Sequence, residues 1–167
     1  PSSVSVIDAY AFRGCVSIKH IEIPYSVRTI GNNAFRECSS LLSITVPTSV
    51  TDLGAYSFSD CQSLKEVTIL APISQIKEYV FSGCRSLTQI KLPSTVVSIG
   101  RDAFNECSSL TKICLPDTVH TIEEFAFNGC SSLTDFSIPS SITTLADYTF
   151  NDCKAIQHIT IPFNVTK

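Results

Sequence analysis

The sequence predicts a right-handed solenoid of seven 23-residue repeats, with a parallel sheet on its concave face and short strands or 3₁₀ turns opposite. Two observations support this prediction. Cysteines recur at intervals of 23 residues, at Cys15, Cys38, Cys61, Cys84, Cys107, Cys130 and Cys153. A phenylalanine precedes each by three residues, at Phe12, Phe35, Phe58, Phe81, Phe104, Phe127 and Phe150. Residues 1–167 are therefore expected to form one repeat array.

Two further columns keep the same period. A leucine or isoleucine follows each cysteine by three residues, at Ile18, Leu41, Leu64, Leu87, Leu110, Leu133 and Ile156. Prolines stand at Pro1, Pro24, Pro47, Pro93, Pro116, Pro139 and Pro162. In one repeat Leu70 takes the place of the proline, and Pro72 follows two residues later. Because the repeat length is unchanged, this irregularity predicts a local change of path without an insertion.

Within one repeat the apolar spacing predicts each element in turn. Ile44 and Val46 alternate with polar residues, which indicates a short strand of roughly five residues. Pro47 ends that strand, because proline has no N–H for a ladder. Val50 and Leu53 then indicate a second short extended piece. The Ala-Phe pairs before the cysteines suit a helical or 3₁₀ turn.

A single repeat cannot fold alone. Burying its six large apolar side chains contributes on the order of 9–18 kcal/mol, at about 1.5–3 kcal/mol each. Fixing its 23 backbone units costs roughly 23–46 kcal/mol. Neighbouring repeats must therefore share one interior and pair their strands, which places equivalent residues about 4.8 Å apart in columns.

The pattern L-x-x-I-x-[IVL]-P-x-x-V-x-x-I-x-x-x-A-F-x-x-C resembles the BspA-type (Treponema pallidum-type) leucine-rich repeat over essentially the whole chain. Commoner leucine-rich repeats have Asn or Cys shortly after the strand, whereas this chain has Pro and then Val there. The resemblance implies a leucine-rich-repeat solenoid (a horseshoe of the strand-dominated α/β class). It also implies a surface or secreted protein that adheres to host proteins or to other cells.

The outward strand positions are the candidate partner-binding residues, since repeat scaffolds use such extended faces for recognition. This face is polar, mixed in charge and rich in hydroxyl groups; the alternative is a solvated face that binds nothing. The positions are His20, Glu22, Ser43, Thr45, Glu66, Thr68, Gln89, Lys91, Lys112, Cys114, Asp135, Ser137, His158 and Thr160.

The repeated cysteines are expected to be small buried thiols that fill the turn and weakly cap backbone groups. Cysteines spread along an axis do not converge on a metal, so no metal site is expected. Disulfides between adjacent turns fit the allowed spacing, but seven is an odd number and the side chains point alongside one another. Cys114 lies outside the column on the outward face: it is either a reactive or crosslinking thiol, or a tolerated surface cysteine.

A partial aromatic column stands two residues before the phenylalanines, at Tyr10, Tyr56, Tyr79, Phe125 and Tyr148, and Asn33 and Asp102 interrupt it. It is either a ridge for a partner, since tyrosines favour interfaces, or packing over the turn.

No enzymatic activity and no cofactor are expected. Catalysis would need a nucleophile, a base and an orienting group within hydrogen-bond reach. His20 and His158 occupy one column six repeats apart, and His120 lies beyond Pro116, so no such group forms. The net charge is −3, and no basic run favours nucleic acid or anionic lipid. No apolar stretch reaches the roughly 20 residues of a membrane helix.

The expected partners are proteins, including extracellular-matrix or cell-surface proteins, at the cell surface or in the medium. The alternatives are an intracellular interaction scaffold in the cytoplasm and a structural spacer. The chain reads as an uncapped fragment of a longer protein, so its ends are expected to expose Val4, Val6, Ile7, Ile159, Ile161 and Val165 and to associate end to end. Asn164-Val165-Thr166 is a glycosylation sequon, but a single such triplet often occurs by chance and so adds little to the expectation of secretion.

Overall fold

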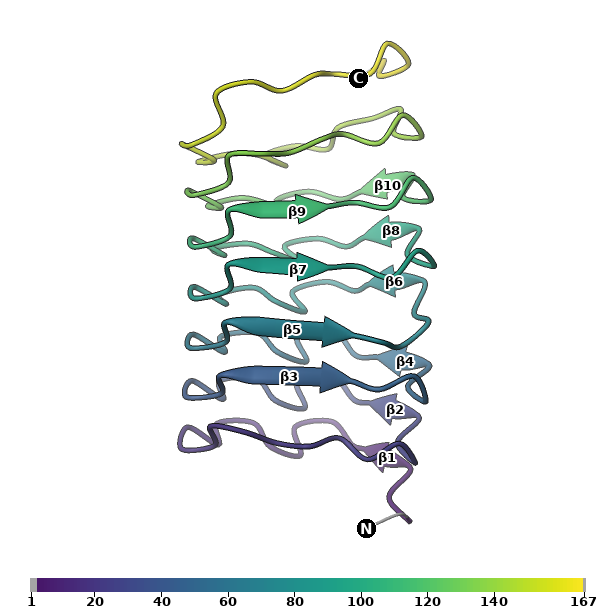
Figure 1. Cartoon of the computed structure of the whole chain (residues 1–167), viewed down its shortest axis with the longest axis vertical. Helices are drawn as coiled ribbons and strands as arrows, with labels where there is room; N and C mark the ends of the chain where they lie inside the picture. Colours follow the sequence, from purple (N-terminus) through teal and green to yellow (C-terminus); the bar gives the residue numbers. More distant parts are fainter. Residues whose placement is uncertain (1–2, 167) are drawn as a thin grey trace.

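The chain winds as a right-handed coil whose turns stack along one axis (Figure 1). The structure is a computed structural model that describes residues 3–166. The repeated phenylalanines mark the stack, because neighbouring rings from Phe12 to Phe150 lie nearly face to face with centroids 5.2–5.8 Å apart. The predicted repeat solenoid is therefore confirmed.

A parallel four-stranded sheet forms the near side of the coil in Figure 1. The outward surface of this sheet, together with the equivalent segments of the repeats before and after it, is called the first face below. Each strand pairs with the strand 23 residues later, so Ile44 lies beside Val67 and Val67 beside Ile90. These residues point into the core, and their neighbours along the strand point outward. The predicted alternation is confirmed in β3 (Ser43–Val46), β5 (Glu66–Ile69), β7 (Gln89–Lys91) and β9 (Lys112–Cys114).

Shorter strands on the far side of the coil correspond to the second extended piece of each repeat (Figure 1). They form two separate parallel sheets, ordered β1-β2-β4 and β6-β8-β10. The outward surface of the second of these sheets is called the second face. The strands are β1 (Val6–Ile7), β2 (Thr29–Ile30), β4 (Asp52–Leu53), β6 (Gln75–Ile76), β8 (Ser98–Ile99) and β10 (Thr121–Ile122).

The interruption between β4 and β6 follows the irregular repeat. Leu70 has the N–H that proline lacks and donates it to the Val46 carbonyl at 2.9 Å, so the first-face ladder runs one residue further there. On the far side, the column that holds Gly31, Gly54 and Gly100 holds Lys77 instead. A Cβ at Gly54 would lie 2.4 Å from the Gly31 carbonyl carbon, so Gly54 permits the close approach of β4 to β2, and Lys77 has a side chain in the equivalent position. The Lys77 Nζ–Asp52 Oδ1 ion pair at 2.6 Å joins the two repeats instead.

The predicted helical or 3₁₀ turn at the Ala-Phe pairs is wrong: among residues 3–166 the structure has no helix, and these segments are turns. The reason is backbone conformation, because two positions per repeat have positive φ. One of them is the aromatic column, from Tyr10 (φ 63°) to Tyr148 (φ 58°). The resulting path points alternate N–H groups at the next repeat, as in Phe12 N–H to the Ala34 carbonyl at 2.8 Å. This ladder replaces the hydrogen bonds of a helix.

The predicted exposure of the array ends is partly confirmed. Val6, Ile159 and Ile161 are exposed. Ile7 was expected to be exposed but is 8% exposed and belongs to the core, because its strand pairs with β2. Val4 and Val165 were also expected to be exposed and are half-buried against the same core.

Candidate binding faces

Side chains of the first face stand where the sequence predicted them. Thirteen of the fourteen candidate residues are exposed, and Ser43 is half-buried. They form two columns: one runs through Glu66, Gln89 and Lys112, and the other through Thr68, Lys91 and Cys114. Both columns follow the strand register, so the face is continuous along the coil axis.

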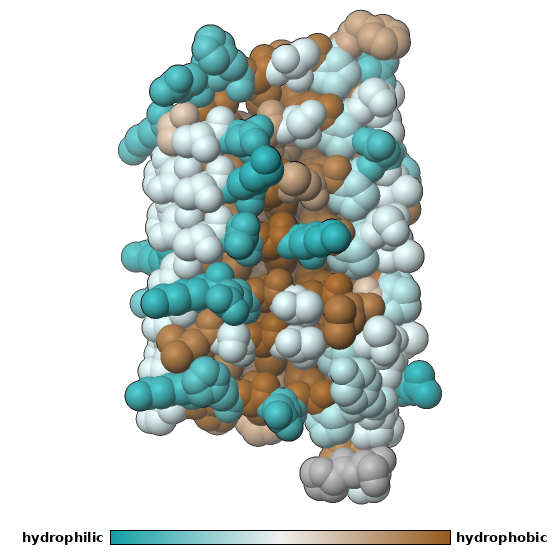
Figure 2. All heavy atoms as spheres, in the orientation of Figure 1, coloured by the Kyte–Doolittle hydropathy of each residue, from teal (hydrophilic) through white to brown (hydrophobic). Residues whose placement is uncertain are grey.

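Grooves hollow the first face between these columns, where Figure 2 shows a hydrophobic strip bordered by hydrophilic and neutral side chains. A groove of about 540 Å³ lies over β5, β7 and β9, with Glu66, Gln89, Lys91, Lys112 and Cys114 around it. A second groove of about 810 Å³ lies over the first repeats, where His20, Glu22 and Tyr25 contribute. Volumes of several hundred Å³ are typical of small-ligand sites or of pockets for single partner side chains.

Positive charge gathers at the middle of this face. Lys112 Nζ pairs with Asp135 Oδ2 at 2.8 Å, and this hydrogen bond raises the pKa of Lys112. Lys91 forms no ion pair within residues 3–166, so its ammonium group is available to a partner. Cys114 is an exposed free thiol directly beside Lys91 in the strand register.

The repeated cysteines serve the scaffold, as predicted. Each thiol from Cys38 to Cys153 donates to the carbonyl of the phenylalanine 26 residues earlier, at 3.1–3.2 Å. All eight cysteines are free. Burial raises the pKa of Cys61, Cys84, Cys107 and Cys130 well above the ordinary value, which keeps these thiols protonated. Within residues 3–166, no three His, Cys, Asp or Glu side chains converge as a metal site would require.

The aromatic column forms short stacks at the turn instead of one ridge. Tyr56 and Tyr79 stack with centroids 4.4 Å apart, and Phe125 and Tyr148 at 4.8 Å. A hydrogen bond to Asp102 and burial raise the pKa of Tyr79 to about 12. The Tyr79 hydroxyl is thus occupied by its hydrogen bond to Asp102, whereas the side chains of Tyr10 and Tyr148 are exposed at 55% and 61%.

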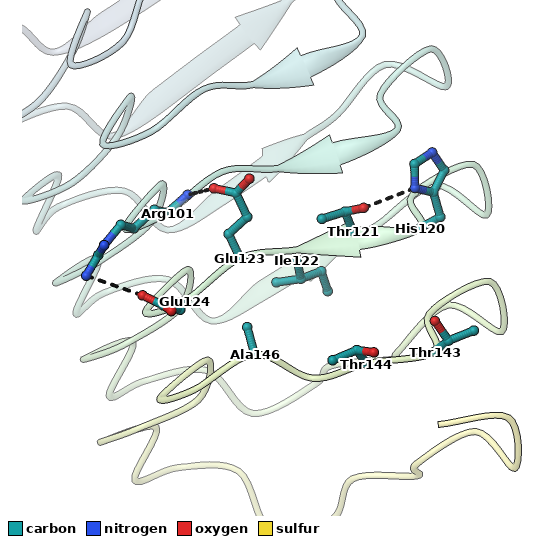
Figure 3. Close-up of a pocket in the computed structure, with 9 residues that line it drawn as sticks. All are labelled: Arg101, His120, Thr121, Ile122, Glu123, Glu124, Thr143, Thr144 and Ala146. Atoms are coloured by element: carbon teal, nitrogen blue, oxygen red, sulfur yellow. Dashed lines mark hydrogen bonds and ion pairs between the residues drawn. The ribbon is translucent and has the colours of Figure 1, made fainter. Parts of the chain in front are cut away.

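A hollow of about 550 Å³ on the second face escaped sequence analysis (Figure 3). It lies over β10 and the repeat that follows β10, and Arg101 of the preceding repeat also lines it. Glu123 and Thr121 lie on one side and Thr144 and Ala146 on the other, with His120 at one end. The signal that could have revealed it is the glycine column, since Ala146 places a small residue in that column next to Glu123.

The histidines do not combine with a nucleophile. His20 and His158 lie at opposite ends of the first face, as expected from their spacing. The Nδ1 atom of His120 lies 3.1 Å from Thr121 Oγ1, on the second face.

The sequon asparagine has a structural role. Asn164 Nδ2 donates to the carbonyls of Ser140 and Ile142 at 2.7 and 3.0 Å. Thr118, in the same column, also donates to the preceding repeat, at 3.0 Å to the Ser94 carbonyl. The amide of Asn164 is therefore engaged in the scaffold.

The family model described as BspA type Leucine rich repeat region matches residues 1–84 and 56–167, in six copies. A leucine-rich repeat protein from Bacteroides ovatus is 32% identical with a TM-score of 0.91, over 96% of this chain and 42% of that protein. The T. pallidum Leucine Rich Repeat protein is 28% identical with a TM-score of 0.85, over 95% and 75%. A leucine rich cell surface protein from Faecalibacterium prausnitzii is 29% identical with a TM-score of 0.60, over 85% and 31%.

No curated protein matches the chain at a significant level. The chain spans less than half the length of the B. ovatus relative, at 42%. Within the described part of the chain, no helix is long and apolar enough to cross a membrane.

Proposed function

The chain belongs to the BspA-type leucine-rich repeat family, and we propose that it binds a protein partner through the first face, as a recognition or adhesion module at the cell surface. The observation that carries this proposal is the continuous exposed face, hollowed around the free ammonium group of Lys91. A rigid array of paired strands presents these side chains without ordering loops on binding, which lowers the entropic cost of association. The first face, with Lys91, Lys112 and Gln89 at its centre, is the proposed interface.

Binding, without intrinsic catalysis, is the activity we propose. The family and its structural relatives are repeat proteins. The first face carries a thiol and ammonium groups, but its histidines, His20 and His158, lie far from Cys114 along the array. A nucleophile without a neighbouring base lacks the arrangement that covalent catalysis uses.

The test is binding of the purified chain to a panel of purified extracellular-matrix and cell-surface proteins. The variant Lys91→Glu/Lys112→Glu reverses the charge at the centre of the first face. A central interface position typically changes affinity tenfold or more, so loss of a bound partner is expected. The matched control is Arg28→Glu/Arg85→Glu, which makes the same charge change at two exposed cations outside that face.

A partner that both variants bind equally well would place the interface elsewhere. Absence of any partner from the panel would favour the intracellular scaffold or the spacer. Surface localisation is proposed because a relative is a leucine rich cell surface protein. Protease treatment of intact source cells tests it, since a surface protein is digested and an intracellular one is protected.

End-to-end self-association of the 167-residue chain is also proposed. The N–H groups of Tyr148, Phe150 and Asp152 would continue the turn ladder, but find no acceptor within the described residues. The carbonyls at positions 9, 11 and 13 accept no hydrogen bond there and have the matching register. Stacking of one copy on another would pair these groups. Light scattering at rising concentration tests it, and a constant monomer mass would contradict it.

A further inference from the structure

We infer that the hollow on the second face is a separate binding site for a neutral, hydroxyl-rich ligand, of the chemical class of a sugar residue. Its volume of about 550 Å³ falls within the roughly 300–1,000 Å³ of small-ligand sites. The proposed protein interface lies on the first face, so this site is independent of it.

The hollow exists because a side-chain column is interrupted. Ala146 has only a methyl group where the preceding repeat has Glu123, which leaves the space beside Glu123 open. Ile122 is 3% exposed and supplies a floor between the polar side chains. Figure 3 shows Thr121 on β10 with His120 and Glu123 flanking that strand, and Thr143, Thr144 and Ala146 along the next repeat.

The polar groups around the hollow retain unused hydrogen-bonding capacity. The Oε2 atom of Glu123 accepts the Arg101 N–H at 2.8 Å, and its Oε1 atom has no donor within residues 3–166. Thr143 and Thr144 are exposed where they line the hollow, and each hydroxyl group can donate and accept. His120 meets Thr121 through Nδ1 and leaves Nε2 for a ligand.

Positive charge is directed away from the hollow. Arg101 is held by Glu124 at 3.3 Å and by Asp102 at 3.6 Å, and its guanidinium lies over the Phe125 ring at 5.8 Å. Arg101 thus shapes the wall, and its backbone N–H holds one carboxylate oxygen of Glu123. The carboxylate of Glu123 forms no ion pair with a side-chain cation within the described residues.

This set of groups selects among ligand classes. A phosphate or carboxylate ligand would be repelled by Glu123, and an apolar ligand would bury that carboxylate without a donor. Adjacent hydroxyls of a sugar ring can donate to Glu123 and exchange hydrogen bonds with the threonines and His120. Hydroxyl-rich ligands therefore fit the site best.

The test is a titration of the full chain, labelled for amide NMR, with methyl α-mannoside, methyl β-galactoside, N-acetylglucosamine and glucosamine in turn. Shifts confined to residues 120–124 and 143–146 with at least one neutral sugar are expected. In Glu123→Gln the affinity should fall by roughly tenfold, because a hydrogen bond to a charged acceptor is lost. Glu66→Gln on the first face is the matched control and should leave the affinity unchanged.

Failure of every neutral sugar to shift these amides would overturn the inference. Binding of glucosamine alone would also overturn it, because the site would then recognise an ammonium group. Equal affinities of the native chain and Glu123→Gln would overturn the role of the carboxylate. The amide spectrum itself verifies that each variant is folded. A negative sugar titration would not contradict the proposed protein interface, because none of the residues that line the hollow belongs to the first face.

Discussion

The thiol of Cys84 donates a hydrogen bond to the carbonyl oxygen of Phe58 at 3.2 Å, across the boundary between two repeats. The same carbonyl accepts the N–H of Cys61 at 3.3 Å. Each phenylalanine carbonyl from Phe12 to Phe127 is thus shared by the turn of its own repeat and the cysteine of the next. A cysteine in this column therefore links consecutive repeats without forming a disulfide.

The free energy of unfolding should fall as the pH rises above about 9. Burial raises the pKa of Cys38 and of Cys153 from 9.0 to about 11. Unfolded thiols ionise from about pH 9, whereas the native thiols stay protonated until about pH 11. The unfolded state therefore binds fewer protons in this window, and native stability is progressively lost between these values.

Urea unfolding between about pH 7 and about pH 10.5 measures this dependence, because this range brackets the thiol pKa of roughly 9 in the unfolded chain. The control is Cys38→Ala/Cys153→Ala, which should be less stable at neutral pH but should decline less steeply above pH 9. A slope identical in both proteins would exclude these thiols as its source.

Phe104→Ala should destabilise the array by about 3–5 kcal/mol. Phe104 is fully buried and stacks between Phe81 and Phe127, at 5.5 and 5.4 Å. Its removal leaves a void that the rigid neighbours cannot fill. The comparison variant Lys91→Ala, on the exposed first face, should change stability by less than about 0.5 kcal/mol. Chemical denaturation measures both; comparable values would refute the assignment of inward and outward positions.

Gly54→Ala should destabilise the far side by about 1–3 kcal/mol, through overpacking. The added Cβ would lie 2.4 Å from the Gly31 carbonyl carbon and 2.5 Å from Asn32 N, and backbone atoms cannot move aside cheaply. Lys77→Ala in the same column removes only an exposed ion pair and should cost less than about 1 kcal/mol. Thermal unfolding of the two variants tests the contrast. An equal loss would mean that close backbone approach is unimportant here.

Asp102→Asn should lower the pKa of Tyr79 from about 12 towards the ordinary value of 10.0. The carboxylate accepts a hydrogen bond from the phenol and opposes a second negative charge beside it. A phenolate absorbance titration should show one tyrosine ionising earlier in the variant. Glu124→Gln, which changes the neighbouring carboxylate paired with Arg101, serves as the control. An unchanged titration in Asp102→Asn would show that burial alone holds the Tyr79 proton.

Periodicity predicted the solenoid, the two short strands found in each of the four central repeats and the outward residues of the first face. The first, sixth and seventh repeats were also expected to have a strand on this face, but the structure has none at residues 20–22, 135–137 or 158–160. Residues such as Ile44 and Thr45 are assigned to opposite sides by alternation, which depends only on local strand geometry. The turn at each Ala-Phe pair was mispredicted for a related reason. A helix satisfies its hydrogen bonds within one segment, whereas Phe12 donates to Ala34 in the next repeat.

The sequence by itself determined the repeat, its register and the buried columns, because the phenylalanine, cysteine and leucine or isoleucine positions recur at the same interval of 23 residues. Only the tertiary structure decided the β4–β6 interruption and the second-face hollow. The first depends on how close two backbones come, as at Gly54, and the second on where a small side chain lies between larger neighbours, as at Ala146. Such distances arise when repeats stack, and no single repeat encodes them.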